Sequence, residues 1–184
     1  MISKQILFFF DYDAHQTNLS KEDDKDVLIQ MLESFDNETE NGKLYISYPM
    51  VEALRDYDAG ICGNKEDCFV AIDKLGEYKN ASALRSFNPH IKDYDIAVWK
   101  DIIDVFAMRL SCLFRASTIL DYDYYSKMVS PYNIYELEEK EAEKQRVFVL
   151  SAFPEFLIDY FGVKLWKTSV KHAKNLLNIQ NCKL

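Results

Sequence analysis

The sequence predicts an α/β protein, mainly helical, in which a small parallel βαβ portion at the N-terminus packs on a helical C-terminal bundle. Three observations support this fold class. An apolar run at residues 6–10 is typical of a strand, a strand–helix–strand order follows, and a long helical stripe begins near residue 95. At 184 residues the chain suits one continuous globule, with an α/β portion at 1–60 and a helical portion at 61–184.

The first strand and helix follow from local pattern. Five apolar residues, Ile6 to Phe10, stand directly before the acid Asp11, which predicts a strand buried on both faces as in a parallel sheet. Ser20, followed by acids, is a helix-capping signal. The helix after it is predicted from apolar residues at 3.6-residue spacing, namely Val27, Leu28, Met31, Leu32 and Phe35.

A second strand and a crossover come next. Asn41-Gly42 is a strong turn signal, and residues 43–47 have the composition of a strand. A strand, a helix and a second strand over about forty residues favour a right-handed βαβ unit. Pro49 then suits the first turn of a short helix.

The rest of the chain is predicted mostly helical. Residues 58–67 resemble a loop, and residues 68–72 fit either a strand or a helical turn. From Asp95 one apolar stripe predicts a long helix: Trp99, Ile102, Ile103, Phe106, Leu110, Leu113 and Phe114. Pro131 opens a further helix through the charged run 136–146, and residues 147–161 form a central buried segment. Gly162 ends that segment, and a basic amphipathic helix is expected over 164–177.

Composition limits the class of protein. The net charge is −8, and residues 1–59 account for all of it, with thirteen acids against five basic residues. Such an acidic surface repels naked nucleic acid, which argues against a simple DNA-binding module. No apolar stretch reaches the length of about 18 residues that a membrane span needs, and no secretory signal is expected. The four cysteines are scattered, which favours reduced thiols in the cytoplasm over zinc or disulfides.

The one pattern that indicates chemistry is Asp11-Tyr12-Asp13 at the end of the first strand. Residues two apart on a strand share a face, so the two carboxylates are expected to converge at the carboxyl edge of the sheet. Glu52, five residues after the second strand, is a candidate third carboxylate. Three such groups suit Mg²⁺, with Mn²⁺ as a substitute, in a catalytic metal site. The alternatives are a turn-forming or capping acidic pair and a solvated Glu52.

Two further sets of residues have weaker signals. His15 fits either a phosphate-orienting or proton-transferring residue or an ordinary loop histidine. Four lysines at helical spacing fit either a contact face for nucleic-acid phosphates or a solvated helix face: Lys164, Lys167, Lys171 and Lys174.

The order of strand, Asp-x-Asp, helix, strand and Tyr48-Pro49-Met50-Val51-Glu52 resembles the second half of TOPRIM-like domains. It is most similar to those of bacterial phage-defence nucleases of the RloB and OLD type. The segments at 42–52 and 150–154 also resemble those of bacterial proteins of unassigned function. The resemblance covers residues 5–57. It implies Mg²⁺-dependent phosphodiester chemistry at the Asp-x-Asp pair, together with a glutamate from an earlier strand.

The TOPRIM pattern places this glutamate upstream of Asp-x-Asp, whereas only residues 1–5 precede the strand here. This departure leaves four alternatives. Either the chain is a fragment, or a protein partner supplies the acid, or Glu52 replaces it, or the site is inactive. Homo-oligomers are also compatible with the sequence.

Two rival functions remain. The first is a non-catalytic interaction or regulatory protein with a degenerate acidic site, whose helical part docks a partner. The second is a phosphatase that resembles the haloacid dehalogenases, in which Asp11 is the nucleophile, Asp13 the general acid/base and Ser47 the phosphate-binding serine. His15 departs from that pattern, because a Thr or Val is expected at its position.

Overall fold

The structure is a computed structural model that describes residues 5–12, 22–37, 39–57, 68–85 and 90–170. The N-terminal sheet has the order β1-β3-β2, formed by β1 (Leu7–Asp11), β3 (Gly42–Ser47) and β2 (Asp36–Asn37). Strands β1 and β3 are parallel, and α1 (Glu22–Ser34) lies between them in the sequence. The fold is therefore mixed α/β and mainly helical, with a small N-terminal sheet, as the sequence predicted.

Strand β3 is the buried centre of this sheet, and β1 is an edge strand. The prediction that β1 is buried on both faces is wrong, because Phe9 and Phe10 are 39% and 47% exposed. Among the described strands β1 pairs with β3 alone, so one side of it has no strand cover. Phe8 packs on Phe35 and Phe9 stacks on Phe153, which explains why an edge strand is rich in aromatic residues.

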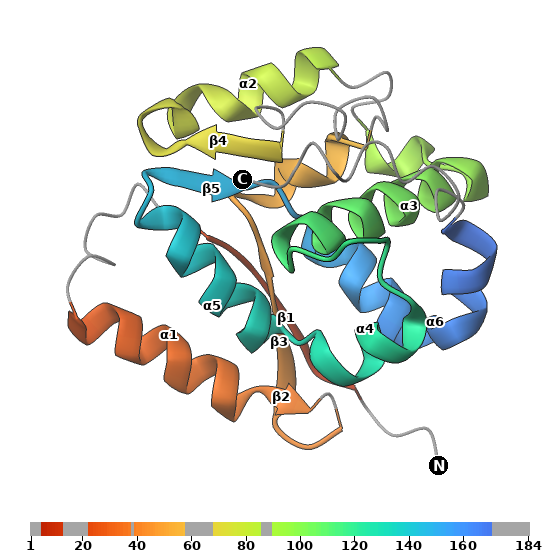
Figure 1. Ribbon diagram of the computed structural model, residues 1–184, viewed down its shortest axis with the longest axis horizontal. Coiled ribbons are helices and arrows are strands. Elements are labelled where there is room, and N and C mark those ends of the chain that lie inside the picture. The colour runs from red at the N-terminus through yellow and green to blue at the C-terminus, as the bar shows by residue number, and fades with distance from the viewer. Residues whose placement is uncertain (1–4, 13–21, 38, 58–67, 86–89, 171–184) are drawn as a thin grey trace.

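Helices cover both faces of β3, so the sheet lies in the middle of three layers (Figure 1). On one face, Lys43, Tyr45 and Ser47 contact α6 (Ala152–Ser169). Side chains alternate along a strand, so Leu44 and Ile46 point to the opposite face. There α1 and α5 (Pro131–Ala142) pack on β3.

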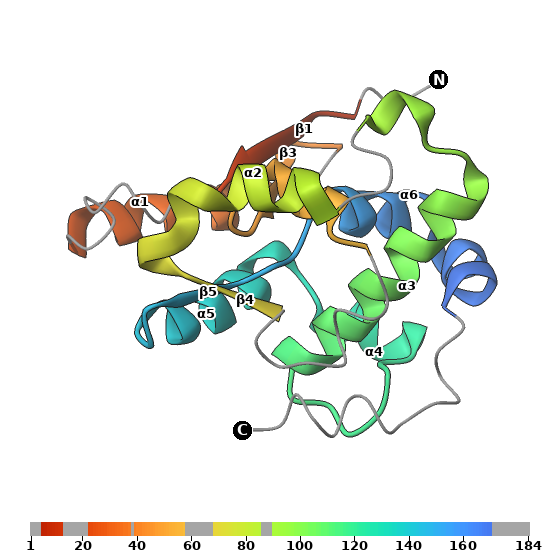
Figure 2. The ribbon, with the colours of Figure 1, turned by 90° about the horizontal axis from the view of Figure 1, so that it is seen from above.

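A second, antiparallel sheet pairs β4 (Phe69–Ala71) with β5 (Arg146–Phe148). The ambiguous segment 68–72 is thus a strand that leads into η5 (Ile72–Lys74) and α2 (Leu75–Arg85). A bridge between Tyr48 and Leu150 links the end of β3 to the residues after β5. Figure 2 shows α2 above the β4–β5 pair and α3 (Ile96–Leu113) beside α6.

The predicted long helix from Asp95 is confirmed as α3. The Asp95 carboxylate accepts a hydrogen bond from the Val98 amide at 2.9 Å, which caps the first turn. Most of the predicted stripe is buried, including Ile102, Ile103, Phe106, Leu110 and Leu113. Shorter helical segments are η2 (Val51–Arg55), η6 (Ile91–Asp93) and α4 (Tyr122–Met128).

Helix α5 opens at Pro131 as predicted, capped by Ser130, but it ends at Ala142 rather than at residue 146. The reason is Gln145, whose φ of 59° stops the helix and turns the chain into β5.

The predicted buried segment 147–161 is divided between β5 and the first part of α6. Val147 and Ile158 are fully buried, whereas Tyr160 and Phe161 are more than half exposed. Gly162, with a φ of 65°, interrupts α6, as the sequence predicted for the end of this segment. The helix then resumes to Ser169, and the expected helix beyond residue 170 lies outside the described residues.

The main hydrophobic core draws on residues from both sides of position 60, including Leu44, Ile46, Ile103, Phe148 and Ile158. In the described ranges, no helix has both the length and the apolar character needed to cross a membrane.

Candidate functional site

Asp11 lies at the carboxyl end of β1, beside Ser47 at the end of β3. Its Oδ1 accepts a hydrogen bond from the backbone amide of Val51 at 2.8 Å. Val51 begins η2, so the carboxylate satisfies one of the amides that a helix start leaves without an internal partner. One oxygen of Asp11 therefore caps the start of η2, which corresponds to the capping alternative considered from the sequence.

Glu52 follows Val51 and thus belongs to the segment that Asp11 contacts. The backbone of η2 at Val51 lies beside the carboxyl end of β1, where Asp11 is placed. The Glu52 side chain is buried, however, and its Oε1 forms an ion pair with Lys79 Nζ of α2 at 3.1 Å. A metal at Glu52 would therefore compete with this lysine.

Asp13 and His15 lie outside the described residues, so the proposed Asp11–Asp13 pair stays a prediction. Within the part of the chain that the structure describes, no group of three or more His, Cys, Asp or Glu residues is arranged to hold a metal ion. Asp11 and Glu52 by themselves are thus an incomplete set of ligands.

Ser47, the serine of the phosphatase alternative, serves the fold. It is buried, and its Oγ accepts a hydrogen bond from the Ala152 amide at the start of α6, at 3.2 Å. The Ser151 hydroxyl accepts from Phe153 N at the same helix start. Ser47 thereby fixes α6 against the end of β3, and because the residue is only 3% exposed, its hydroxyl is not accessible to a phosphate in this structure.

Lys164 and Lys167 are exposed on the last part of α6. Lys171 and Lys174 lie outside the described residues. Both interpretations of the four lysines, as a contact face for nucleic-acid phosphates or as a solvated surface, remain predictions.

Sequence reasoning missed a polar cluster between β3, α4 and α6, centred on Asp159. One oxygen of Asp159 accepts hydrogen bonds from Lys43 Nζ and from Tyr45 OH, the latter at 3.0 Å. The other accepts from Tyr125 OH at 2.8 Å. Lys43 and Tyr45 are two residues apart on a strand, so they share a face, and this spacing is the signal that could have identified them.

Glu155 lies one helical turn before Asp159 and is 3% exposed. Burial is the main cause that raises the pKa of Glu155 to about 8, and the negative charge of Asp159 acts in the same direction. Lys43 opposes both effects. Glu155 is therefore mostly protonated at neutral pH. The spacing of Glu155 and Asp159 inside an otherwise apolar segment was the sequence signal for this acid pair.

Comparison with known proteins gives no family: no protein-family model matches the sequence, and no curated protein or solved structure is significantly similar to it.

Proposed function

We propose that this chain contributes Asp11 to a Mg²⁺-dependent phosphodiesterase site, of the nuclease type, which is completed by a strand from a protein partner. The observation that carries the proposal is that β1 is an edge strand ending in an exposed aspartate. An edge strand offers backbone groups to a further strand, and the acid at its end marks where the two strands would finish.

The direction of the outer backbone groups follows from the bonds on the inner side. Ile6 O accepts from Lys43 N and Tyr12 N donates to Ser47 O, both toward β3. Backbone direction alternates along a strand, so the amides and carbonyls of Leu7 and Phe9 face away from β3. Ile6, Phe9 and Phe10 are each more than a third exposed, which adds apolar surface for an incoming strand.

A strand added parallel to β1 would bring its own carboxyl end next to Asp11, because parallel strands end at the same edge. An acid at that end would supply the glutamate that the TOPRIM resemblance calls for. The oxygen ligands available here, from Asp11 and the predicted Asp13, fit a hard cation such as Mg²⁺ or Mn²⁺. Bound there, the ion would activate a water and stabilise charge on a phosphodiester.

Asp11 and the predicted Asp13 should already bind the ion weakly before the partner strand is added, so the test is binding of Mn²⁺ by the chain alone, measured as loss of the electron paramagnetic resonance signal of free Mn²⁺. Asp11→Asn removes the charge but keeps an oxygen that can accept from Val51 N, so the fold should persist. Wild type and the matched control Asp73→Asn, an exposed acid on η5, should bind Mn²⁺, and Asp11→Asn should not. Equal binding by all three proteins would refute the metal site.

A second candidate function is a non-catalytic interaction module that uses the same strand edge. It is favoured by the structural use of both acids, since Asp11 bonds to Val51 N and Glu52 pairs with Lys79. The absence of Mn²⁺ binding in wild type would support this candidate over the first.

The cellular context is part of the same proposal. The TOPRIM resemblance suggests a role in phage defence, with DNA or RNA as the substrate class. A cytoplasmic location suits the two buried cysteines of the described ranges, Cys68 and Cys112, which form no disulfide.

A further inference from the structure

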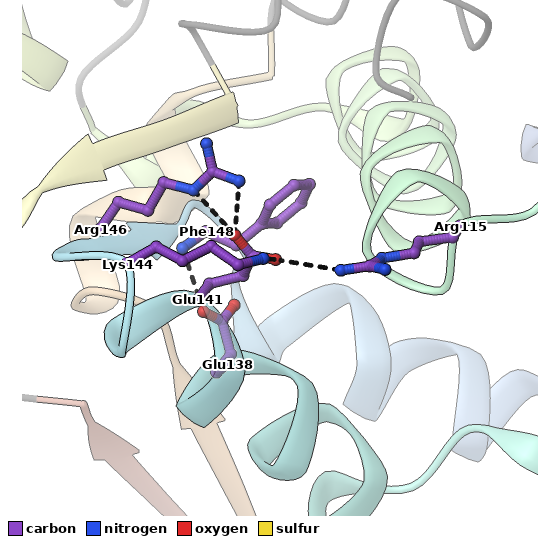
Figure 3. Close-up of polar contacts among 6 residues, drawn as sticks. All are labelled: Arg115, Glu138, Glu141, Lys144, Arg146 and Phe148. Atoms are coloured by element: carbon purple, nitrogen blue, oxygen red, sulfur yellow. Dashed lines mark hydrogen bonds and ion pairs between the residues drawn. The ribbon is translucent and has the colours of Figure 1, made fainter. Parts of the chain in front are cut away.

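A basic cluster, defined here as Arg115, Lys144 and Arg146, surrounds the carboxylate of Glu141 at the end of α5 (Figure 3). Lys144 Nζ donates to Glu141 Oε1 at 2.7 Å. Arg146 Nε donates to Oε2 at 2.8 Å, and its second nitrogen Nη2 lies 2.7 Å from the same oxygen. Arg115 Nη2 lies 3.9 Å from Oε1. Three positive groups therefore converge on a single carboxylate.

The charges in the cluster do not balance. Hydrogen bonds from Lys144 and Arg146 outweigh the effect of burial and lower the pKa of Glu141, so this carboxyl is ionised at neutral pH. Burial raises the pKa of the neighbouring Glu138 well above its ordinary value, which favours its neutral form. Three cations against one anion leave an excess of positive charge on a protein whose net charge is −8.

The cations remain accessible. The Arg115, Lys144 and Arg146 side chains are 75%, 45% and 33% exposed, whereas Glu141 is buried. At 3.9 Å the Arg115 guanidinium is beyond hydrogen-bond distance of Glu141, and within the described residues this ion pair is its one polar contact. Arg146 also stacks over Phe69, at 3.9 Å from its ring centre, which orients its guanidinium.

The backbone at the cluster is also unusual. In the described ranges, two residues other than glycine have a left-handed φ, Arg115 at 53° and Gln145 at 59°. The first belongs to the cluster and the second separates Lys144 from Arg146. Both residues follow helix ends, where a left-handed residue turns the chain. These two turns place Arg115, Lys144 and Arg146 around Glu141.

We propose that Arg115, Lys144 and Arg146 form a binding site for a phosphate group, with Glu141 holding the three side chains together. Phosphate oxygens accept charge-assisted hydrogen bonds from several donors at once, and guanidinium groups match their geometry. The buried Glu141 takes the inner side of the cluster, and the phosphate takes the exposed side, where Arg115 and Lys144 have the most solvent access. This site is independent of β1 and η2.

The test is the affinity for two probes, pyrophosphate and a 5′-phosphorylated single-stranded oligonucleotide, measured by isothermal titration calorimetry at constant ionic strength. Arg115→Gln and Arg146→Gln should each weaken binding by roughly tenfold, the loss expected for a charge-assisted hydrogen bond. The matched control is Lys127→Gln, an exposed lysine on α4, which should bind as wild type does.

The two probes identify the source of the phosphate. If the two arginine variants lose affinity for pyrophosphate but not for the oligonucleotide, the site takes a small phosphorylated ligand. If they lose affinity for the oligonucleotide, the site takes a nucleic acid. The site is refuted if neither probe binds, or if all three variants bind each probe as wild type does. Arg146→Gln loses the stack on Phe69 and could fail to fold for that reason. In that case Arg115→Gln decides. The Arg115 side chain is 75% exposed, and glutamine, which already adopts a left-handed φ at position 145, suits the φ of 53° at position 115.

Discussion

Replacement of Glu155 by glutamine should make the protein less sensitive to rising pH. Glu155 is buried in α6 beside Asp159, and burial raises its pKa to about 8 from the ordinary 4.5. The folded protein therefore holds this proton more tightly than the unfolded chain does. The contribution of the protonated Glu155 carboxyl to the free energy of unfolding is fully present below about pH 4.5. It is lost as the pH rises toward about 8.

The size of the effect follows from the two pKa values. Each pKa unit corresponds to about 1.4 kcal/mol, so ionisation of Glu155 lowers the free energy of unfolding by up to about 5 kcal/mol above pH 8 and by about 3 kcal/mol at pH 7. Glutamine has nearly the shape of the protonated acid but cannot ionise. Glu155→Gln should match wild type in acid and exceed it by these amounts at higher pH.

Urea denaturation at intervals between about pH 5 and about pH 9 measures this difference. Trp166 gives a local fluorescence signal, because its ring lies 5.1 Å from that of Tyr125, which bonds to Asp159. Glu136→Gln, an exposed position on α5, is the matched control and should show no pH-dependent gain. A stability difference between Glu155→Gln and wild type that stays constant across the range would refute the reasoning.

Two further predictions concern packing around the same sheet and are also measured by urea denaturation. Tyr125→Phe should lower the free energy of unfolding by about 1–3 kcal/mol, because Asp159 loses a hydrogen-bond donor at 2.8 Å. The control Tyr124→Phe, on the exposed side of α4, should have little effect. Equal losses of stability in the two variants would contradict the role of the Asp159 cluster. Gly42→Ala should cost more than about 1 kcal/mol, since φ is 103° and an added Cβ would lie 2.5 Å from a ring carbon of Phe8. Gly162→Ala shares a positive φ but meets no atom closer than 3.4 Å, so a larger loss there than at Gly42 would contradict the steric argument.

Local signals in the sequence were sufficient for β1, α1, β3, α3 and the start of α5. Asp95 and Ser130 cap α3 and α5 through their own side chains, and Pro131 begins α5 where its fixed φ suits a first turn. These interactions span a few residues, so they can be read from spacing alone. The end of α5 could not, because Gln145 adopts a left-handed φ that its residue type does not announce.

The acidic candidate site could be placed only in part. The position of Asp11 at a strand end, and the approach of the 51–52 backbone to it, follow from parallel strand order. The partners of the two carboxylates did not follow from the pattern. Val51 N and Lys79 Nζ reach them through a turn and a distant helix, and such contacts depend on how separate elements pack.

By itself the sequence determined the order β1, α1, β3 at the N-terminus, the starts of α3 and α5 and the uneven charge, because these depend on neighbours along the chain. The tertiary structure decided that the Phe-rich strand β1 lies at an edge rather than in the centre of the sheet. It also gathered Lys43, Tyr125 and Asp159 into one polar cluster. Exposure and partner choice depend on which surfaces meet, and residues more than 80 positions apart in the sequence, such as Lys43 and Asp159, meet only when the whole chain is folded.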